Sequence, residues 1–197
     1  MHIITTGIAT CVLTTVLVGC APAVIGGVSV VGATVAQERS VGNAIDDTTI
    51  TTHINSLYIQ EDVKHLFENI DVQSHEGRVL LTGEVPTADN RVEAVRLAWQ
   101  PQGIREVINE IEIRKKSSPK QYARDTWITT QIKTKLLFAE NVRSINYSVD
   151  TVGGVVYLLG LAQDKGELKS VATLASKVPD VKKVISYVKL KNDPERY

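Results

Sequence analysis

The chain has 197 residues, with 22 Lys and Arg against 22 Asp and Glu, so its formal net charge is zero. Aromatic residues make up 5% of the sequence, and the length fits one or two small domains. We expect no nucleic-acid partner.

Residues 1–19 are predicted to be a signal peptide. The run from Ile3 to Val18 is apolar and uncharged, and it is too short to favour a membrane-spanning helix. It leads into Leu17-Val18-Gly19-Cys20, a tetrad that resembles a bacterial lipobox. The resemblance implies cleavage before Cys20 and lipidation of that cysteine. Because Ala21 rather than Asp follows, it also implies sorting to the outer membrane.

Two alternatives stay open for this segment. The start Met1-His2 lacks the positive charge expected of a signal peptide, so Cys20 could lie near an ordinary cleavage site, unless the start codon is misplaced. An uncleaved anchor is the second alternative, because small and apolar residues continue to Ala36. After cleavage Cys11 is also lost, and the mature chain has no disulfide and no cysteine metal site. Residues 20–43 are predicted to be a tether.

Residues 44–113 and 123–191 are predicted to be two copies of one small domain. Gly77–Gly83 aligns with Gly154–Gly160 at an offset of 77 residues. A period of this length is too long for a solenoid repeat and indicates a duplicated domain. The copies are joined by a basic linker, 114–122, and residues 192–197 form a tail.

Each copy is predicted to fold as α-β-β-α-β, an α+β unit with two helices packed on one face of a three-stranded sheet. The first helices are expected over 47–59 and 125–138, with Asp46-Asp47 and Asp125 interpreted as caps. Glycine-containing turns at 75–77 and 152–154 predict hairpins. The remaining predicted elements are strands 70–73, 78–82, 145–149 and 155–159, helices 87–99 and 164–177, and final strands 106–113 and 182–190.

The neutral total conceals opposite charges on the two halves. Residues 44–113 contain 13 acidic and 5 basic residues, a balance of −8. Residues 114–197 contain 16 basic and 8 acidic residues, a balance of +8. The halves are therefore expected either to face different partners or to dock electrostatically onto each other.

The repeated hairpin and the final strand of each copy resemble the BON domain, with its Gly-x-Val-x-Leu-x-Gly motif. The matching residues are Gly77, Val79, Leu81 and Gly83 in the first copy, and Gly154, Val156, Leu158 and Gly160 in the second. A lipobox, a tether containing Arg39-Ser40-Val41-Gly42, and two such domains resemble the dual BON-domain outer-membrane lipoproteins of Gram-negative bacteria, the division and outer-membrane stress-associated lipid-binding protein family. The resemblance covers essentially the whole mature chain. It implies anionic phospholipid binding through the second domain, a role in envelope integrity, and no catalysis.

Catalytic residues, cofactors and metal sites are not expected. The histidines His2, His53, His65 and His75 have no paired spacing that would form a zinc site. His53 and His75 are interpreted as surface residues. The Gly153-Gly154 pair lacks the Lys-Ser/Thr of a phosphate-binding loop and is interpreted as a turn.

The first helix of the second copy is predicted to have two apolar faces. Ile128, Ile132 and Leu136 form the stripe that packs on the sheet. The second face consists of Trp127, Thr130, Thr134, Leu137 and Phe138, with Lys133 and Lys135 on its flanks. Apolar residues rimmed by lysine suit an anionic membrane surface. The positions aligned with Trp127, Lys133, Thr134, Leu137 and Phe138 in the first copy are mostly polar: Thr49, Asn55, Ser56, Ile59 and Gln60.

The main functional hypothesis is a lipid-anchored protein on the periplasmic face of the outer membrane that binds phosphatidylglycerol or cardiolipin. The resemblance implies lipid contacts by Trp127, Lys133 and Leu137. In a structural alternative, Trp127 and Phe138 pack against the first domain or the linker. In a functional alternative, the protein is an interaction adaptor whose acidic first domain docks a basic partner of the envelope-assembly or division machinery.

Overall fold

The computed structural model describes residues 41–60, 64–114 and 117–194. The predicted signal peptide 1–19, the lipidation site Cys20, most of the predicted tether 20–43, and residues 195–197 lie outside the described residues.

In the described residues, the first domain has three helices and a three-stranded sheet in the order β1-β2-β3. Strands β1 and β2 are antiparallel, whereas β2 and β3 are parallel and are connected through a helix. Its elements are α2 (Val41–Gln60), α3 (Lys64–Phe67), β1 (Ile70–His75), β2 (Arg78–Val85), α4 (Ala88–Ala98) and β3 (Glu106–Ile113).

The second domain repeats this topology, with sheet order β4-β5-β6. Its elements are α5 (Pro119–Leu137), the 3-10 helix η1 (Ser144–Asn146), β4 (Tyr147–Val152), β5 (Val155–Ala162), α6 (Lys165–Ser176) and β6 (Lys183–Leu190). The predicted α+β fold with two α-β-β-α-β units is confirmed.

The first helix of each domain begins earlier than predicted. Helix α5 starts at Pro119, inside the segment predicted as linker, because Ser118 caps it and accepts a hydrogen bond from the Gln121 amide at 3.2 Å. Helix α2 starts at Val41, inside the predicted tether. The short helix α3 was not predicted, and η1 occupies the beginning of the predicted strand 145–149.

Asp47 and Asp125 are not caps, contrary to the prediction, because both lie within their helices. The Asp47 carboxylate accepts hydrogen bonds from the Glu76 amide at 2.7 Å and the Gly77 amide at 2.9 Å. Asp125 accepts the equivalent bonds from the Gly153 and Gly154 amides at 3.0 and 2.9 Å. Both side chains are buried. Each aspartate therefore fixes the first helix of its domain to the hairpin turn of the sheet.

The predicted hairpin turns are confirmed. Both central residues of each two-residue turn have positive φ, as a type I′ turn requires: Glu76 +55°, Gly77 +74°, Gly153 +61° and Gly154 +84°. The prediction that His75 is a surface residue is wrong, since it is 6% exposed at the end of β1.

The last glycine of each hairpin motif lies where no side chain fits. Gly83 has a φ of +124°, and a Cβ there would lie 2.0 Å from the Asn69 carbonyl oxygen. Gly160 has a φ of +149°, and a Cβ there would lie 2.1 Å from the Asn146 carbonyl oxygen. Close approach of the chain before β1 or β4 explains this element of the motif.

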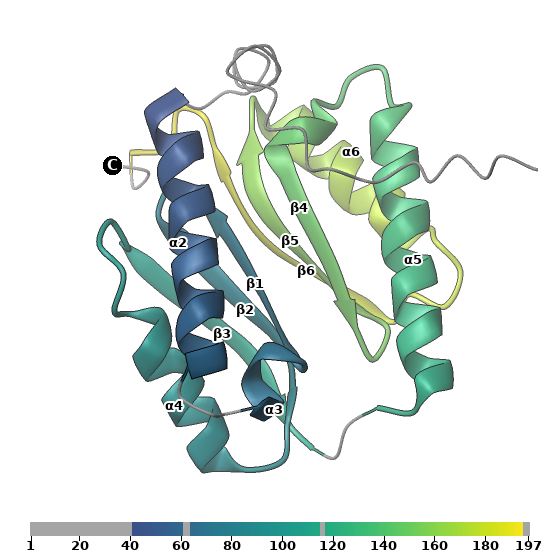
Figure 1. Cartoon of the computed structure of the whole chain (residues 1–197). Helices are drawn as coiled ribbons and strands as arrows, with labels where there is room; N and C mark the ends of the chain where they lie inside the picture. Colours follow the sequence, from purple (N-terminus) through teal and green to yellow (C-terminus); the bar gives the residue numbers. More distant parts are fainter. Residues whose placement is uncertain (1–40, 61–63, 115–116, 195–197) are drawn as a thin grey trace, which may run out of the picture.

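The two sheets pack face to face, with the helices on the outer sides, so the molecule has four layers (Figure 1). Strand β1 lies against β5, and β2 lies against β4. The centre of the contact is apolar and consists of Leu80, Ile108, Val152, Tyr157 and Leu159. Burial of apolar surface therefore contributes to the docking of the oppositely charged halves.

Polar contacts surround this apolar centre. The Thr82 hydroxyl donates a hydrogen bond to Asp150 at 2.5 Å, and Arg78 Nη1 donates one to the Tyr187 carbonyl at 2.8 Å. The buried Glu84 accepts hydrogen bonds from Arg114 Nε at 2.8 Å and from the Ser117 amide at 2.6 Å, so it contacts the first residue after β3 and a residue just before α5.

Candidate functional site

Helix α5 presents one side to its sheet and the opposite side to solvent. Ile128, Ile132 and Leu136 are at most 1% exposed and form part of the second-domain core. One hydrogen bond joins the helix directly to strand β4, from the Thr129 hydroxyl to the Thr151 hydroxyl at 2.8 Å. These contacts fix the rotation of α5 about its axis and place its second predicted face outward.

The outward side of α5, which we call the α5 face, consists of Trp127, Thr130, Thr134, Leu137 and Phe138. Trp127 is 62% exposed, Leu137 66% and Phe138 78%. The structural alternative, in which Trp127 and Phe138 pack against the first domain or the linker, is therefore wrong. Thr130 and Thr134 are exposed as well, as are the flanking Lys133 and Lys135.

The two threonines of the α5 face have hydroxyl groups that already donate hydrogen bonds. The Thr130 hydroxyl donates to the Thr126 carbonyl, and the Thr134 hydroxyl donates to the Thr130 carbonyl, both at 2.8 Å. Transferring a hydroxyl that is already hydrogen-bonded out of water costs less free energy than transferring a free hydroxyl. The α5 face is therefore less polar than its composition indicates.

The early start of α5 adds two cations that the sequence analysis missed. At 100° per residue, Lys120 lies on the line of Trp127, two turns earlier, and Arg124 lies on its flank. Both are exposed, and Arg124 pairs with Asp180 at 3.6 Å. The Ser118-Pro119 pair is a helix-start signal that would have included them.

Lys133 lies on α5 one turn after Thr129, whose hydroxyl contacts Thr151 of the edge strand β4. Asp150, the residue before Thr151, lies between the two sheets, where it accepts the hydrogen bond from Thr82. Burial raises the pKa of Asp150, and so does the nearby Asp71 carboxylate, whereas the hydrogen bond from Thr82 and the charge of Lys133 lower it. Lys133 is thus placed between the α5 face and the contact of the two domains.

Helix α2 of the first domain has the same buried stripe but a different outward side. Ile50, Ile54 and Tyr58 are at most 3% exposed, as are their counterparts in α5. At the outward positions, Thr49 and Gln60 are exposed and polar, and Ile59 is 58% exposed. The duplication has therefore kept the core stripe in both domains and the aromatic face in the second.

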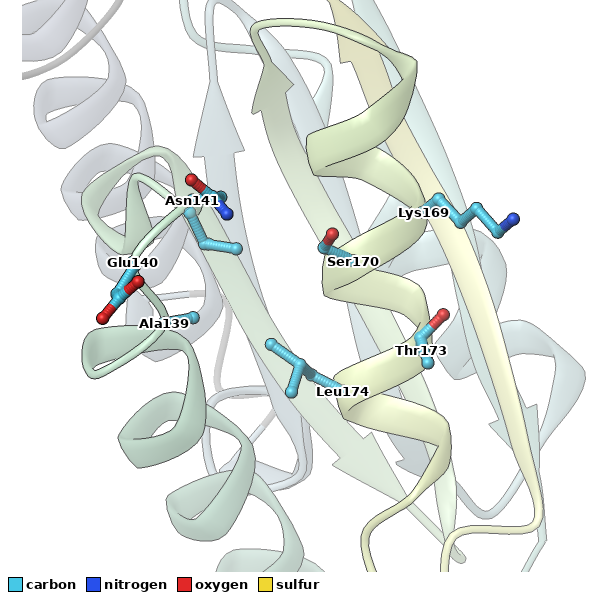
Figure 2. A pocket seen from close by; sticks show the side chains of 8 residues that line it. Ala139, Glu140, Asn141, Lys169, Ser170, Thr173 and Leu174 are labelled. Carbon is cyan, nitrogen blue, oxygen red and sulfur yellow. The ribbon is translucent and has the colours of Figure 1, made fainter.

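A shallow hollow of about 460 Å³ lies beside the end of the α5 face, between α6 and the segment that follows α5 (Figure 2). Ala139, Val142 and Leu174 give it an apolar lining, and Asn141 and Ser170 are among its polar residues. Within the described residues there is no cluster of side chains that could hold a metal ion. Over the same part of the chain, we find no helix with the length and apolarity needed to cross a bilayer.

Comparison with known proteins also identifies two copies of one domain in this chain. The BON domain model matches residues 46–115 and 124–192. The chain is 36% identical over 174 residues to outer membrane lipoprotein DolP of Haemophilus influenzae, covering 88% of this chain and 89% of that protein.

Two further relatives have similar coverage. An uncharacterized protein in the gshII 5' region of Anaplasma centrale is 45% identical over 153 residues, which is 77% of this chain and 99% of that protein. Osmotically-inducible protein Y of Escherichia coli is 33% identical over 156 residues, covering 78% and 77% of the two chains.

Two α-β-β-α-β units that match the BON model define a tandem BON-domain protein. Together with the similarity to DolP over most of both chains, this shows that the chain belongs to the dual BON-domain lipoprotein family.

Proposed function

We propose that the protein is a non-enzymatic lipoprotein, lipidated at Cys20 and anchored on the periplasmic face of the outer membrane, where it binds anionic phospholipid through the α5 face. The observation that carries this proposal is the exposure of Trp127, Leu137 and Phe138 on one side of a helix whose opposite side is fully packed. Exposed apolar groups of this size next to lysines fit a headgroup region containing phosphatidylglycerol or cardiolipin.

Trp127 supplies the largest apolar contribution to this contact. A tryptophan side chain buries about 150–250 Å², so at roughly 25 cal/mol/Å² complete burial contributes at most about 4–6 kcal/mol. Partial entry into the headgroup region contributes less. Lys133 and Lys135 add attraction to phosphate, which weakens as salt shortens the Debye length below about 10 Å.

A lipid anchor makes a weak second contact sufficient. Acyl chains on Cys20 would hold the protein at the bilayer, so binding by α5 becomes an intramolecular step. For a short flexible connection, the effective concentration is of order mM. The name of the relative DolP supports an outer-membrane site, and that of osmotically-inducible protein Y supports a role in envelope stress.

Flotation of the mature chain carrying Cys20→Ser tests the lipid contact without the acyl chains. Wild-type α5 is expected to bind vesicles of phosphatidylglycerol or cardiolipin more tightly than phosphatidylcholine vesicles, and high salt is expected to weaken this binding. Trp127→Glu should abolish it while circular dichroism and thermal unfolding stay unchanged, because Ile128, Ile132 and Leu136 still form the core. Thr49→Glu, at the aligned position of α2, is the matched control and should bind normally. Full binding by Trp127→Glu would contradict the proposal.

A second candidate function is supported by a different helix. In the acidic first domain, Val92 on α4 is 65% exposed, and Trp99, which caps the C-terminal end of that helix, is 49% exposed. Such a pair suits a protein partner, in agreement with an adaptor for envelope-assembly or division proteins. An adaptor without lipid affinity would fail to bind protein-free vesicles of every composition, so the flotation experiment separates the two functions.

A further inference from the structure

Helices α5 and α6 lie on the same face of the second sheet, so their outward sides point in the same direction. Ile132 from α5 and Val171 and Ala175 from α6 share one core with Val156 and Leu158 of β5. The two helices also contact each other. A flat surface that meets the α5 face therefore extends across the outward side of α6.

The outward side of α6 carries lysines. Opposite the buried Val171 and Ala175, helical geometry places Lys165, Lys169 and Lys177, with Thr173 and Ser176 between them. All five are exposed. In Figure 2, Lys169 and Thr173 project away from the 139–142 segment, whereas Leu174 projects toward it.

The first domain provides an internal comparison for these lysines. At the offset of 77 residues, the positions aligned with Lys165, Lys169 and Lys177 are Ala88, Val92 and Gln100. None of these is cationic. The lysines thus occur in the same copy of the domain as the aromatic α5 face.

Among the described residues, three acidic residues lie on or near this side of the second domain, and two of them have hydrogen-bond or ion-pair partners within it. Asp164 caps α6 and accepts hydrogen bonds from the Gly166 and Glu167 amides, and Asp180 pairs with Arg124. Glu140 follows α5 and is exposed. The outward sides of α5 and α6 still carry more cations than these three acids balance, since Lys120, Lys133 and Lys135 add to the three lysines of α6.

We propose that α5 and α6 together form a two-helix platform that binds one anionic bilayer surface. The α5 face enters the headgroup region, and Lys169 and Lys177, with Lys165 behind them, contact lipid phosphates beside it. This inference rests on the membrane contact proposed for α5 and extends it to a second helix. The lysines of α6 are complementary in charge to an anionic bilayer, and their surface is continuous with the α5 face. We therefore infer that α6 contacts the same membrane as α5.

A matched pair of double variants tests the platform. Each lysine near an anionic surface strengthens binding about fivefold, so Lys169→Gln with Lys177→Gln should weaken it about 25-fold. Lys183→Gln with Lys189→Gln is the control. These two lysines lie on β6 and alternate with Val184 and Val188, so they belong to the sheet face opposite the platform. Both double variants remove the same charge from the same domain.

The experiment uses the mature chain with Cys20→Ser and vesicles of equal parts phosphatidylglycerol and phosphatidylcholine, at physiological and at high salt. Loss of binding in the Lys169/Lys177 variant with less than a twofold change in the control supports the platform, and the difference should disappear at high salt. Equal losses in both would show long-range attraction only and overturn it. If neither lysine double variant loses vesicle binding, the platform is overturned. In that case, loss of binding by Trp127→Glu would still support α5 as the membrane contact. If the Cys20→Ser chain without further substitutions does not bind the vesicles, both proposals fail.

Discussion

The Tyr187 hydroxyl donates a hydrogen bond to the Glu110 carboxylate across the contact between the two sheets. The two residues occupy equivalent positions of the duplicated unit, 77 residues apart, on strands β3 and β6. Strands β1 and β4 are equivalent in the two copies, and so are β2 and β5. The contact of β1 with β5 is therefore the counterpart of the contact of β4 with β2. The domains are therefore related by an approximate twofold axis near Glu110 and Tyr187, as in an isologous dimer.

This contact makes the domain interface sensitive to alkaline pH. Burial first, and then Glu110, raise the pKa of Tyr187 from its usual value of 10.0 to about 12. The neutral hydroxyl donates to Glu110, so the contact is fully present below about pH 10 and is lost as the pH rises through 12. Glu110→Gln should lower the pKa of Tyr187, because the hydrogen bond and the negative charge both raise it.

Absorbance titration of the tyrosinate band measures this pKa. The contribution of Tyr187 is obtained by subtracting the titration of Tyr187→Phe from that of the intact chain, and the same subtraction is made in the Glu110→Gln background. An unchanged pKa in that background would mean that the Glu110 contact is absent in solution.

In each domain, the aspartate of the first helix accepts two hydrogen bonds from the hairpin turn, and we call this pair of bonds the clamp. The clamp is expected to contribute strongly to domain stability. Asp47→Ala leaves the amides of Glu76 and Gly77 buried without their carboxylate, and hydrogen bonds to a charged group contribute about 1.5–3 kcal/mol each. We expect a loss of about 2–4 kcal/mol in the free energy of unfolding, measured by urea denaturation. The neighbouring Asp46 is exposed, so Asp46→Ala should change stability by less than about 0.5 kcal/mol. Similar losses in the two variants would rule out the clamp.

The parts of the fold that the sequence predicted are the local ones. The turns follow from glycine positions, and the strands and helices α4 and α6 were predicted to within a few residues. The caps that start these two helices, Thr87 and Asp164, were predicted as helical residues, and their partners lie within three residues. The role of Asp47 was missed because its partners are about 30 residues away. The rotation of α5 followed from periodicity, and its exposed face was predicted correctly, although the Ser118-Pro119 start was overlooked.

Face-to-face packing of the sheets was not predicted, but strand β5 contains a signal for it. Val155–Ala162 is an almost unbroken apolar run, and seven of its eight residues are buried. A strand covered by helices on one face alone would alternate between apolar and polar residues, so a continuous run indicates burial on both faces. Val156 and Leu158 face the helices, whereas Tyr157 and Leu159 face the first domain.

The last glycine of the hairpin motif should tolerate no side chain. In Gly83→Ala, the new Cβ would lie 2.0 Å from the Asn69 carbonyl oxygen, so the backbone before β1 must move. We expect a destabilisation of at least about 3 kcal/mol, measured by thermal or urea unfolding. Gly103 also has a positive φ, +87°, but its nearest neighbour would be Ile50 Cδ1 at 3.7 Å. Gly103→Ala should therefore cost only the backbone strain, about 1–2 kcal/mol. Equal costs for the two variants would show that the close approach to Asn69 is unimportant.

The difference between α2 and α5 predicts a gain of function. In a Trp127→Glu background, Thr49→Trp and Gln60→Phe would give α2 an aromatic face beside Ile59, which is already 58% exposed. The core stripe of Ile50, Ile54 and Tyr58 is untouched, so the first domain should stay folded. The grafted protein should recover vesicle binding through apolar contact.

The lipid preference of this graft should be the reverse of that proposed for the natural face. The first domain has a charge balance of −8, so anionic headgroups repel it, whereas the second domain has a balance of +8. The helices of the two domains lie on opposite outer sides of the molecule, so the basic surface cannot contact the same bilayer as the graft (Figure 1). We therefore expect the graft to bind phosphatidylcholine vesicles at least as well as phosphatidylglycerol vesicles in flotation at low salt, with Thr49→Ala and Gln60→Ala as the control that should not bind. Preference for phosphatidylglycerol by the graft would mean that the charge of the whole molecule, and not that of the contacting domain, selects the lipid.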